Sequence, residues 1–252
     1  MDSLTALMYI LAFLFGITVG SFMNVCILRI PAHESIVTGP SHCPRCGKKL
    51  KWYELIPIFS FLALRGRCSN CKLPISAQYP IIEAVNGILW LLIFYVLGFS
   101  PYAVLACLMV SALFVLSVID VRTREIPQGI NVFILVLAIT AALIDRQNFT
   151  SHIIGFFSIS VPLYLILIIT RGKGIGGGDI KLMAVCGLFL GWKLVVLAFF
   201  IGCLAASIIH LFLMAAKKAD RSLSFGPYLS AGIFLALLWG NLIIDCYLSL
   251  YK

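Results

Sequence analysis

Two aspartates stand at the ends of apolar segments in this chain. Asp120 closes one apolar run, and Asp179 opens another directly after three glycines. Two carboxylates held a few ångströms apart cannot both ionise easily, so such a pair tends to share one proton. In that state one carboxylate can take a proton from water while the other donates to a scissile carbonyl oxygen. Asp120 and Asp179 are therefore the predicted catalytic pair of a peptide hydrolase that forms no covalent intermediate.

The residues around these acids suggest how a substrate is accommodated. Gly176, Gly177 and Gly178 lead into Asp179, and glycines permit positive φ angles and close approach of a substrate backbone. Glu83 lies near the start of another apolar segment, where it either contacts substrate or marks an interfacial helix start. A single acid at such a boundary is more often simply solvated. Two acids, one of them on a glycine-rich turn, favour a functional site.

Four of the nine cysteines form two Cys-x-x-Cys pairs. Cys43 and Cys46 are separated from Cys68 and Cys71 by 21 residues, close to the spacing of four-thiolate zinc sites. Four thiolates suit a tetrahedral structural Zn²⁺ with no open position. A redox-active pair is the alternative, but it requires a thioredoxin-like unit, which this sequence does not resemble. The other five cysteines lie in apolar segments and are expected to pack as small apolar side chains: Cys26, Cys107, Cys186, Cys203 and Cys246.

The composition places these residues in a membrane protein. Of the 252 residues, 62% are hydrophobic and 12% are charged, about half the charge of a soluble domain. Apolar stretches of 17 or more residues recur along the chain, and each is long enough to cross a hydrocarbon core of roughly 30 Å. The expected fold class is an all-α integral membrane protein, and a soluble fold is excluded.

Eight apolar segments are expected to span the bilayer. The first lacks the basic flank and small-residue cleavage site of a signal peptide, so residues 1–28 are expected to form a retained transmembrane helix. A polar loop, 29–80, then holds the cysteines, and 81–252 is expected to form a seven-helix peptidase domain. The eight segments are 4–28, 81–98, 101–119, 129–145, 152–170, 180–190, 193–216 and 226–250.

The first apolar segment carries a stripe of small residues. Gly16, Gly20 and Asn24 follow one another at intervals of four, on one face of a helix. Small residues in such a row let two membrane helices approach closely, so this face is expected to contact another helix.

Basic residues predict the orientation, because loops rich in Lys and Arg stay in the cytoplasm. With the N-terminus outside, sixteen of the 19 Lys and Arg fall in the inner segments 29–80, 120–128, 171–181 and 217–225. The same orientation puts the four cysteines in a reducing compartment, where structural disulfides are disfavoured. It also accounts for the net charge of +9 by topology and attraction to the lipid bilayer. No nucleic-acid partner is therefore expected.

In its order of motifs from about residue 16 to 230, the chain resembles the bacterial type IV prepilin peptidases that also methylate their products. The run ending at Asp179 is similar to the GxGD motif that this family shares with presenilin-type proteases. The other motifs are Gly20-Ser21-Phe22-Met23-Asn24-Val25 with Arg29-Ile30-Pro31, the paired Cys-x-x-Cys, Tyr79-Pro80 with Glu83, Asp120 with Ile126-Pro127, and Phe225-Gly226-Pro227-Tyr228.

The resemblance implies an eight-span enzyme of the bacterial cytoplasmic membrane with a cytoplasmic zinc-binding loop between helices one and two. It implies type IV prepilins or pseudopilins as substrates, cleaved on the cytoplasmic side with Asp120 and Asp179 as the catalytic pair. It further implies methylation of the new N-terminus with S-adenosylmethionine, an activity associated with the cysteine loop, and Gly66 occupies a position linked to methyl transfer. The sequence shows no independent methyl-donor motif, so this second activity rests on the resemblance.

Three other functions fit part of the sequence. A proton-coupled transporter also needs membrane acids, but these usually lie near the midplane, often in repeated halves. A presenilin-like protease without methyltransferase activity would cut within the spans of its substrates, whereas both aspartates here are expected at the membrane boundary. A zinc-containing membrane scaffold leaves the glycine-flanked aspartate unexplained.

Overall fold

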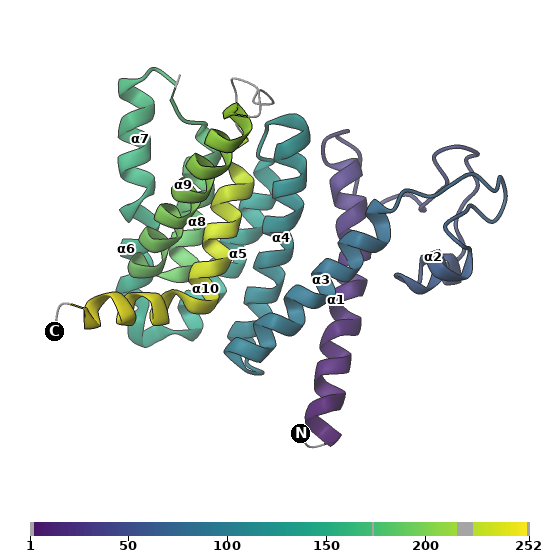
Figure 1. The fold of residues 1–252 in the computed structure, drawn as a ribbon, viewed down its shortest axis with the longest axis horizontal. Coiled ribbons are helices and arrows are strands. Elements are labelled where there is room, and N and C mark those ends of the chain that lie inside the picture. Colours follow the sequence, from purple (N-terminus) through teal and green to yellow (C-terminus); the bar gives the residue numbers. More distant parts are fainter. Residues whose placement is uncertain (1–2, 173, 216–223, 251–252) are drawn as a thin grey trace. The chain divides into compact units, whose positions relative to one another are not determined.

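The chain is all-helical over the residues that the computed structural model describes, 3–172, 174–215 and 224–250. No β-strand is found among them, which confirms the expected fold class. The helices are α1 (Ser3–Arg29), η1 (Trp52–Leu55), α2 (Phe59–Ala63), α3 (Gln78–Leu97), α4 (Pro101–Thr123), α5 (Gln128–Ile144), η2 (Arg146–Asn148), α6 (Phe149–Ser158), α7 (Ser160–Ile169), α8 (Gly177–Leu190), α9 (Trp192–Ala215) and α10 (Gly226–Ser249) (Figure 1).

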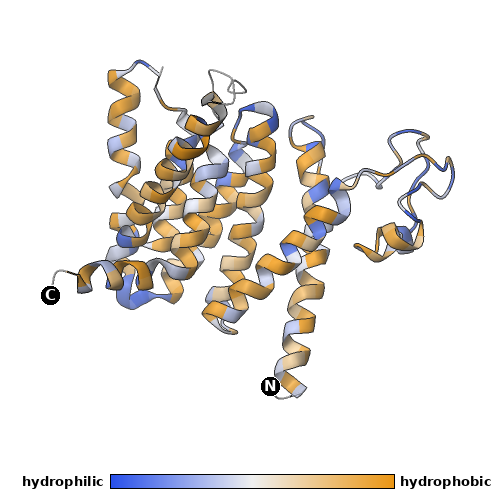
Figure 2. Ribbon diagram, viewed as in Figure 1, coloured by the Kyte–Doolittle hydropathy of each residue, from blue (hydrophilic) through white to orange (hydrophobic). Residues whose placement is uncertain are grey.

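Six segments within the described residues are long and apolar enough to cross a membrane. They are Ser3–Arg29, Gln78–Leu97, Pro101–Thr123, Arg146–Ile169, Trp192–Phe212 and Gly226–Ser249. Hydrophobic residues dominate these helices, while hydrophilic ones gather in the loops and at helix ends (Figure 2). The two remaining expected spans are the shorter helices α5 and α8. Since α8 has 14 residues, it is only about 21 Å long, so the count of eight stays a prediction.

The segment Arg146–Ile169 is interrupted between α6 and α7, at Ile159. Pro162 lies one turn further along and has no N–H to donate to the Ser158 carbonyl, which weakens the helix at this point. The expected span 152–170 is thus present as two consecutive helices. In the orientation argument, Lys173 and the basic residues of 217–223 lie outside the described part of the chain.

The chain divides into two compact units, Met1–Ala103 and Val104–Lys252. The first unit contains α1, the cysteine loop and α3. Helix α3 therefore packs with α1 rather than within the unit that holds Asp120 and Asp179. The functional division at residue 81 stays a prediction, because compactness alone does not assign an activity to either part.

In the first unit, α1 and α3 pack with their backbones in close contact. A Cβ atom added to Gly16 would lie 2.8 Å from the Cα of Gly87, and one added to Gly20 would lie 2.7 Å from the Cα of Glu83. Asn24 Nδ2 donates to the carbonyl of Tyr79 at 3.2 Å. The expected packing stripe of small residues on the first helix is thus confirmed.

In the second unit, α8 is the central helix. From Leu182 to Leu190 every residue is buried, and α5, α6 and α9 pack around it. A helix that is apolar on all sides requires such a covering. The closest crossing joins Gly155 of α6 to Gly187 of α8, where a Cβ on either residue would overlap the backbone of the other. This packing fixes the helix that begins at the glycines before Asp179.

Candidate active site and metal centre

Asp120 is a buried carboxylate near the end of α4. Its side chain is 5% exposed, and its Oδ2 accepts a hydrogen bond from the backbone N–H of Gly226 at 2.9 Å. Gly226 is the first residue of α10, so the carboxylate lies at the positive end of that helix dipole, where negative charge is favoured. A Cβ on Gly226 would lie 2.7 Å from the same oxygen. The site therefore requires glycine here.

Asp179 lies in the first turn of α8, at the N-terminus of a second helix. Gly176, the N-cap residue, donates its backbone N–H to the Asp179 carboxylate, and the charges of Asp179 and Asp120 interact. Two acids from different helices of the second unit are thus each bonded to a backbone N–H at a helix start, near enough for their charges to interact. The catalytic pairing of Asp120 and Asp179 stays a prediction.

Two contacts join the start of α8 to the segment after Asp120. A Cβ on Gly178 would lie 2.9 Å from the Cβ of Ile126, which shows how closely the start of α8 packs against the loop between α4 and α5. Lys181 Nζ donates to Gln128 Oε1 at 3.0 Å. Ile126 belongs to the Ile-Pro motif quoted above, and its role here is to position α8.

The glycines before Asp179 do not use the positive φ angles that glycine permits. Gly176 has φ −73° and ψ 141°, and Gly177 and Gly178 are helical. Neighbouring atoms leave little room for a side chain at two of these glycines. A Cβ added to Gly176 would lie 3.1 Å from the Asp179 carboxylate, and one added to Gly178 would be crowded by Ile126. Gly177 has nothing within 4 Å of its Cβ direction. It is therefore the one glycine of the three that leaves open space beside the acids.

Glu83 lies in the first unit and binds the cysteine loop. Its side chain is 6% exposed, and Oε2 accepts the backbone N–H of Ile58 at 2.7 Å. Ile58 has φ 63°, a conformation that is unfavourable for a β-branched residue and has to be held in place by its surroundings. The structure thus gives Glu83 a loop-anchoring contact, while the predicted contact with substrate stays untested.

The four paired cysteines form one cluster in the first unit. The ligand atoms of Cys43, Cys46, Cys68 and Cys71 all lie within 4.8 Å of one another, and none is in a disulfide. Tetrahedral zinc with Zn–S bonds of about 2.3 Å implies S···S distances of about 3.8 Å, and the sulfurs of Cys43 and Cys71 are 4.0 Å apart. The cluster therefore fits a metal ion without rearrangement of the backbone.

Each cysteine pair lies on a turn of the same design. The N–H of Cys43 donates to the Lys48 carbonyl and that of Cys68 to the Leu73 carbonyl, both at 2.9 Å. The residue four positions after each of these cysteines has positive φ, 70° at Gly47 and 58° at Lys72. Isolated antiparallel bridges, His42 with Lys49 and Arg67 with Pro74, close the two turns.

The environments of the sulfurs differ in how far they favour the thiolate. The backbone N–H of Lys48, followed by the amide of Asn70, lowers the pKa of Cys46 to about 6. Although the backbone of Leu73 donates to Cys71, burial and the neighbouring cysteine sulfurs raise the pKa of Cys71 to about 11. Four thiolates at this spacing repel one another, and a bound divalent cation removes that repulsion.

A half-buried ion pair lies beside the metal cluster. Lys48 Nζ donates to Glu54 Oε1 at 3.0 Å and to Ser69 Oγ at 2.6 Å, and Ser69 Oγ donates to Glu54. The backbone N–H of Lys51, then Ser69 and Lys48, lower the pKa of Glu54 to about 2. This network joins the two Cys-x-x-Cys turns directly, because Lys48 follows the first pair and Ser69 lies within the second.

Gly66 is a turn residue with a left-handed backbone. Its φ is 67°, its N–H donates to the Phe61 carbonyl, and its carbonyl accepts from Ile75, both at 2.8 Å. The turn ends α2 and leads into the second cysteine pair. The link between Gly66 and methyl transfer, which the family resemblance implies, stays a prediction. The geometry shows that Gly66 shapes the turn between α2 and the second cysteine pair.

We expect Gly66→Ala to destabilise this turn by about 1–2 kcal/mol, since an L-residue in the left-handed region incurs roughly that cost. The new Cβ would also lie 3.1 Å from the Phe61 ring. Methylation should fall, and the loop should become more sensitive to protease. Gly98→Ala is the matched control, because Gly98 has φ 69°, open space around its Cβ and no contact with the loop. If the Gly66→Ala and Gly98→Ala variants methylate equally well, Gly66 has no specific role in methylation.

Two buried features of the second unit, one at Asp120 and one on α5, were not singled out by residue type in the sequence. Gly226 donates to Asp120 from 106 positions away, and only its place in the Phe-Gly-Pro-Tyr motif gave a signal. Asn131, in the first turn of α5, is 2% exposed, and both its side-chain Oδ1 and Nδ2 lack a hydrogen-bond partner among the described residues. A polar side chain at the start of an otherwise apolar helix was the available signal for Asn131.

A chain with membrane-length apolar helices, two acids at helix ends in one unit and a four-cysteine cluster in the other has the parts expected of a membrane peptidase with an attached metal-binding domain. Family models match both parts. Residues 14–97 match the Bacterial Peptidase A24 N-terminal domain, and residues 107–211 match the Type IV leader peptidase family. The two matches fall on either side of the division between the compact units.

Proteins named prepilin leader peptidase/N-methyltransferase are similar along most of their length. The protein of this name from Bacillus subtilis is 37% identical over 94% of this chain and 97% of its own. That from Pseudomonas aeruginosa is 31% identical over 94% of this chain and 92% of its own. No solved structure matches the chain. The chain belongs to the type IV leader peptidase family, in its bacterial form with the A24 N-terminal domain.

Proposed function

We propose that this protein cleaves the leader peptide of type IV prepilins or pseudopilins and then methylates the new N-terminus. The observation that supports the peptidase assignment is the charge interaction between Asp120 and Asp179, which are 59 residues apart in the sequence, together with the backbone N–H that each carboxylate accepts at a helix start. The names of the relatives, which join leader peptidase and N-methyltransferase, support the two-step reaction.

The carboxylate pair is proposed to act by general acid–base catalysis. One carboxylate accepts a proton from a water molecule, which attacks the scissile carbonyl, while the protonated partner donates to the carbonyl oxygen. The carboxylate that took the proton from water then gives it to the leaving amine, and the carbonyl oxygen returns the other proton to the second carboxylate. No covalent intermediate with the enzyme forms. Asp120 accepts the backbone N–H of Gly226, and Asp179 accepts that of Gly176. These hydrogen bonds are proposed to orient the two carboxylates, since correct positioning of reacting groups lowers the barrier to reaction.

The enzyme is proposed to reside in the bacterial inner membrane with the cysteine loop and both aspartates on the cytoplasmic side. The distribution of Lys and Arg along the sequence supports this orientation. Asp120 at the end of α4 and Asp179 at the start of α8 would then meet a substrate near the membrane surface. That position suits a short leader that precedes a membrane-embedded helix.

Zn²⁺ is proposed to occupy the cluster of Cys43, Cys46, Cys68 and Cys71 as a structural ion. S-adenosylmethionine is the proposed methyl donor, and when bound it supplies an electrophilic methyl group to the new N-terminal amine. The cysteine loop contains only short helices and two isolated bridges between residues 30 and 77, so a metal staple is needed to stabilise it.

The test is mass spectrometry of a prepilin incubated with the purified protein, with and without S-adenosylmethionine. Loss of the leader together with a gain of one methyl group supports both steps. Loss of the leader alone restricts the function to peptide cleavage. An intact substrate with correctly folded protein overturns the proposal and favours the transporter or scaffold alternatives.

The packing of Gly178 against Ile126 predicts a sharp difference between neighbouring glycines. Gly178→Ala forces α8 away from Ile126, whose Cβ would lie only 2.9 Å from the new methyl group. Because small displacements of catalytic groups slow a reaction strongly, we expect kcat for cleavage to fall about tenfold or more. Gly177→Ala has open space around its Cβ and should keep near wild-type kcat. Equal loss in both variants would show that the glycines admit substrate rather than position the helix.

A further inference from the structure

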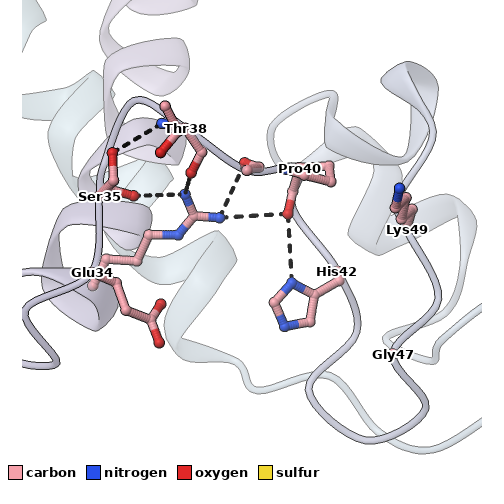
Figure 3. A pocket seen from close by; sticks show the side chains of 9 residues that line it. Glu34, Ser35, Thr38, Pro40, His42, Gly47 and Lys49 are labelled. Carbon is pink, nitrogen blue, oxygen red and sulfur yellow. Dashed lines mark hydrogen bonds between the residues drawn. The ribbon is translucent and has the colours of Figure 1, made fainter.

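The cysteine loop contains a cavity to which no ligand has yet been assigned. It has a volume of about 460 Å³ and opens to solvent, within the range of roughly 300–1,000 Å³ that small-molecule sites occupy. Figure 3 shows the side chains around it. The lining residues are Arg29, Glu34, Ser35, Thr38, Gly39, Pro40, His42, Gly47 and Lys49.

One wall of the cavity is built by Arg29, the last residue of α1. Its guanidinium donates to the carbonyls of Ser35 and Thr38 at 3.0 and 3.1 Å, and also to the carbonyl of Gly39 at 3.3 Å. The Ser35 hydroxyl accepts the N–H of Thr38 at 3.1 Å and closes the turn (Figure 3). A loop that would otherwise be loose is therefore held in one shape beside the membrane helix.

The other wall belongs to the metal module. His42 and Lys49 pair across the antiparallel bridge that closes the first Cys-x-x-Cys turn, and Gly47 lies inside that turn, donating to the Cys43 carbonyl at 2.9 Å. The cavity and the metal cluster thus share one backbone segment. We therefore expect loss of the metal to disturb the cavity. This effect does not require any cysteine sulfur to contact the molecule bound in the cavity.

The charges around the cavity suit a ligand that carries both signs. Glu34 contributes a carboxylate, and Lys49 contributes an ammonium group, with the His42 imidazole beside them (Figure 3). An amino-acid end has a carboxylate for Lys49 and an ammonium for Glu34, and a sulfonium centre is favoured near a carboxylate. Ribose hydroxyls can donate to a carboxylate as well. S-adenosylmethionine combines all of these groups.

We propose that this cavity is the binding site for S-adenosylmethionine, with Glu34 and Lys49 contacting its charged groups. The inference rests on the proposed methyltransferase function. It places the methyl donor beside the first cysteine pair, and it accounts for a dependence of methylation on the cysteines through the wall that the cavity shares with the metal cluster.

A second cavity in the same loop is the rival site. It has a volume of about 360 Å³ and is lined by Leu64, Arg65, Arg67, Cys68, Ser69 and Lys72. The first cavity sets the carboxylate of Glu34 beside its two cationic residues, whereas the second has two arginines and a lysine and no carboxylate, which disfavours a positively charged sulfonium. Its position next to Gly66 nevertheless makes it the natural comparison, and Lys72→Met removes a cation there in the same way as Lys49→Met does in the first cavity.

The test is calorimetric binding of S-adenosylhomocysteine, the demethylated product, to the full-length, metal-loaded protein in detergent. We expect Lys49→Met and Glu34→Gln each to weaken binding about 10- to 100-fold, as for loss of a hydrogen bond to a charged group. Lys72→Met should bind as wild type does. Unchanged zinc content and unchanged prepilin cleavage in all three variants establish that the loop and the membrane domain are folded.

The experiment distinguishes failure of the proposed binding site from failure of the proposed methyltransferase function. Weaker binding by Lys72→Met, with normal binding by the other two variants, moves the donor to the second cavity and overturns the inference. Normal binding by all three variants also overturns it. If the wild-type protein binds neither S-adenosylhomocysteine nor S-adenosylmethionine, methyl transfer itself is refuted, while leader cleavage remains open to its own test.

Discussion

Asp120→Asn and Asp179→Asn should each lower prepilin cleavage by about 10³-fold or more, the scale of general acid–base catalysis. An amide can neither accept a proton from water nor donate one in the way a carboxylic acid does. Asn keeps the size of the side chain, and at position 120 its oxygen can still accept the N–H of Gly226. The loss would therefore be chemical rather than structural. The measurement is the initial rate of leader removal by purified variants of equal thermal stability.

Asp245→Asn is the control for this experiment. Asp245 lies on α10 and is exposed, so the same substitution there should leave the cleavage rate within about twofold, as expected for a surface position. Substantial cleavage by either Asp120→Asn or Asp179→Asn would show that the two carboxylates do not form the catalytic pair. Double substitution should add little to either single one, because groups that act as a unit are strongly non-additive.

Cys43→Ser should abolish methylation while reducing cleavage less. The metal loses one of four thiolates, and the folding energy that a structural zinc ion supplies, about 10–16 kcal/mol in small zinc modules, is largely lost. We expect less than one zinc per chain, rapid tryptic cleavage within 43–76, and no methyl group on the processed substrate. Metal analysis, limited proteolysis and mass spectrometry measure these three outcomes on one preparation. Extended dialysis against a chelator should give the same loop-selective result in the unmodified protein.

Cys246→Ser serves as the matched thiol control, since Cys246 is exposed on α10 and far in sequence from the cluster. It should keep full zinc content and both activities. A Cys43→Ser variant that retains stoichiometric zinc and methylates normally would rule out the four-cysteine metal site. Equal loss of cleavage and methylation would indicate instead that the loop is needed to hold the whole enzyme together.

Several features of the protein followed directly from local sequence. Apolar runs predicted the helices, because burial in lipid or protein requires a long run without charges. The intervals of four between Gly16, Gly20 and Asn24 predicted the close face that packs on α3. The spacing of two Cys-x-x-Cys pairs predicted a cluster whose sulfurs lie within 4.8 Å. Each of these signals depends on residue type and short-range periodicity, which can be read from the sequence alone.

Other features were decided only when the chain folded. The N–H of Gly226 reaches Asp120 across 106 positions, and nothing in either segment specifies the other as its partner. The sequence did not reveal why a small residue is required at Gly178, because the cause is crowding by Ile126, which lies on a different segment. Helix α3 packs against α1 in the first unit, although the sequence suggested that it opens the peptidase domain.

By itself, the sequence determined the family, the helical fold with membrane-length segments and the four candidate metal ligands, and it predicted the two acids. The tertiary structure decided which backbone groups orient the acids, which glycines are crowded, and how a cavity forms beside the cysteine cluster. The physical reason is the range of the interactions. Helix formation and ligand spacing are local, whereas the hydrogen bond of Gly226 and the walls of the cavity depend on atoms brought together by packing of distant segments.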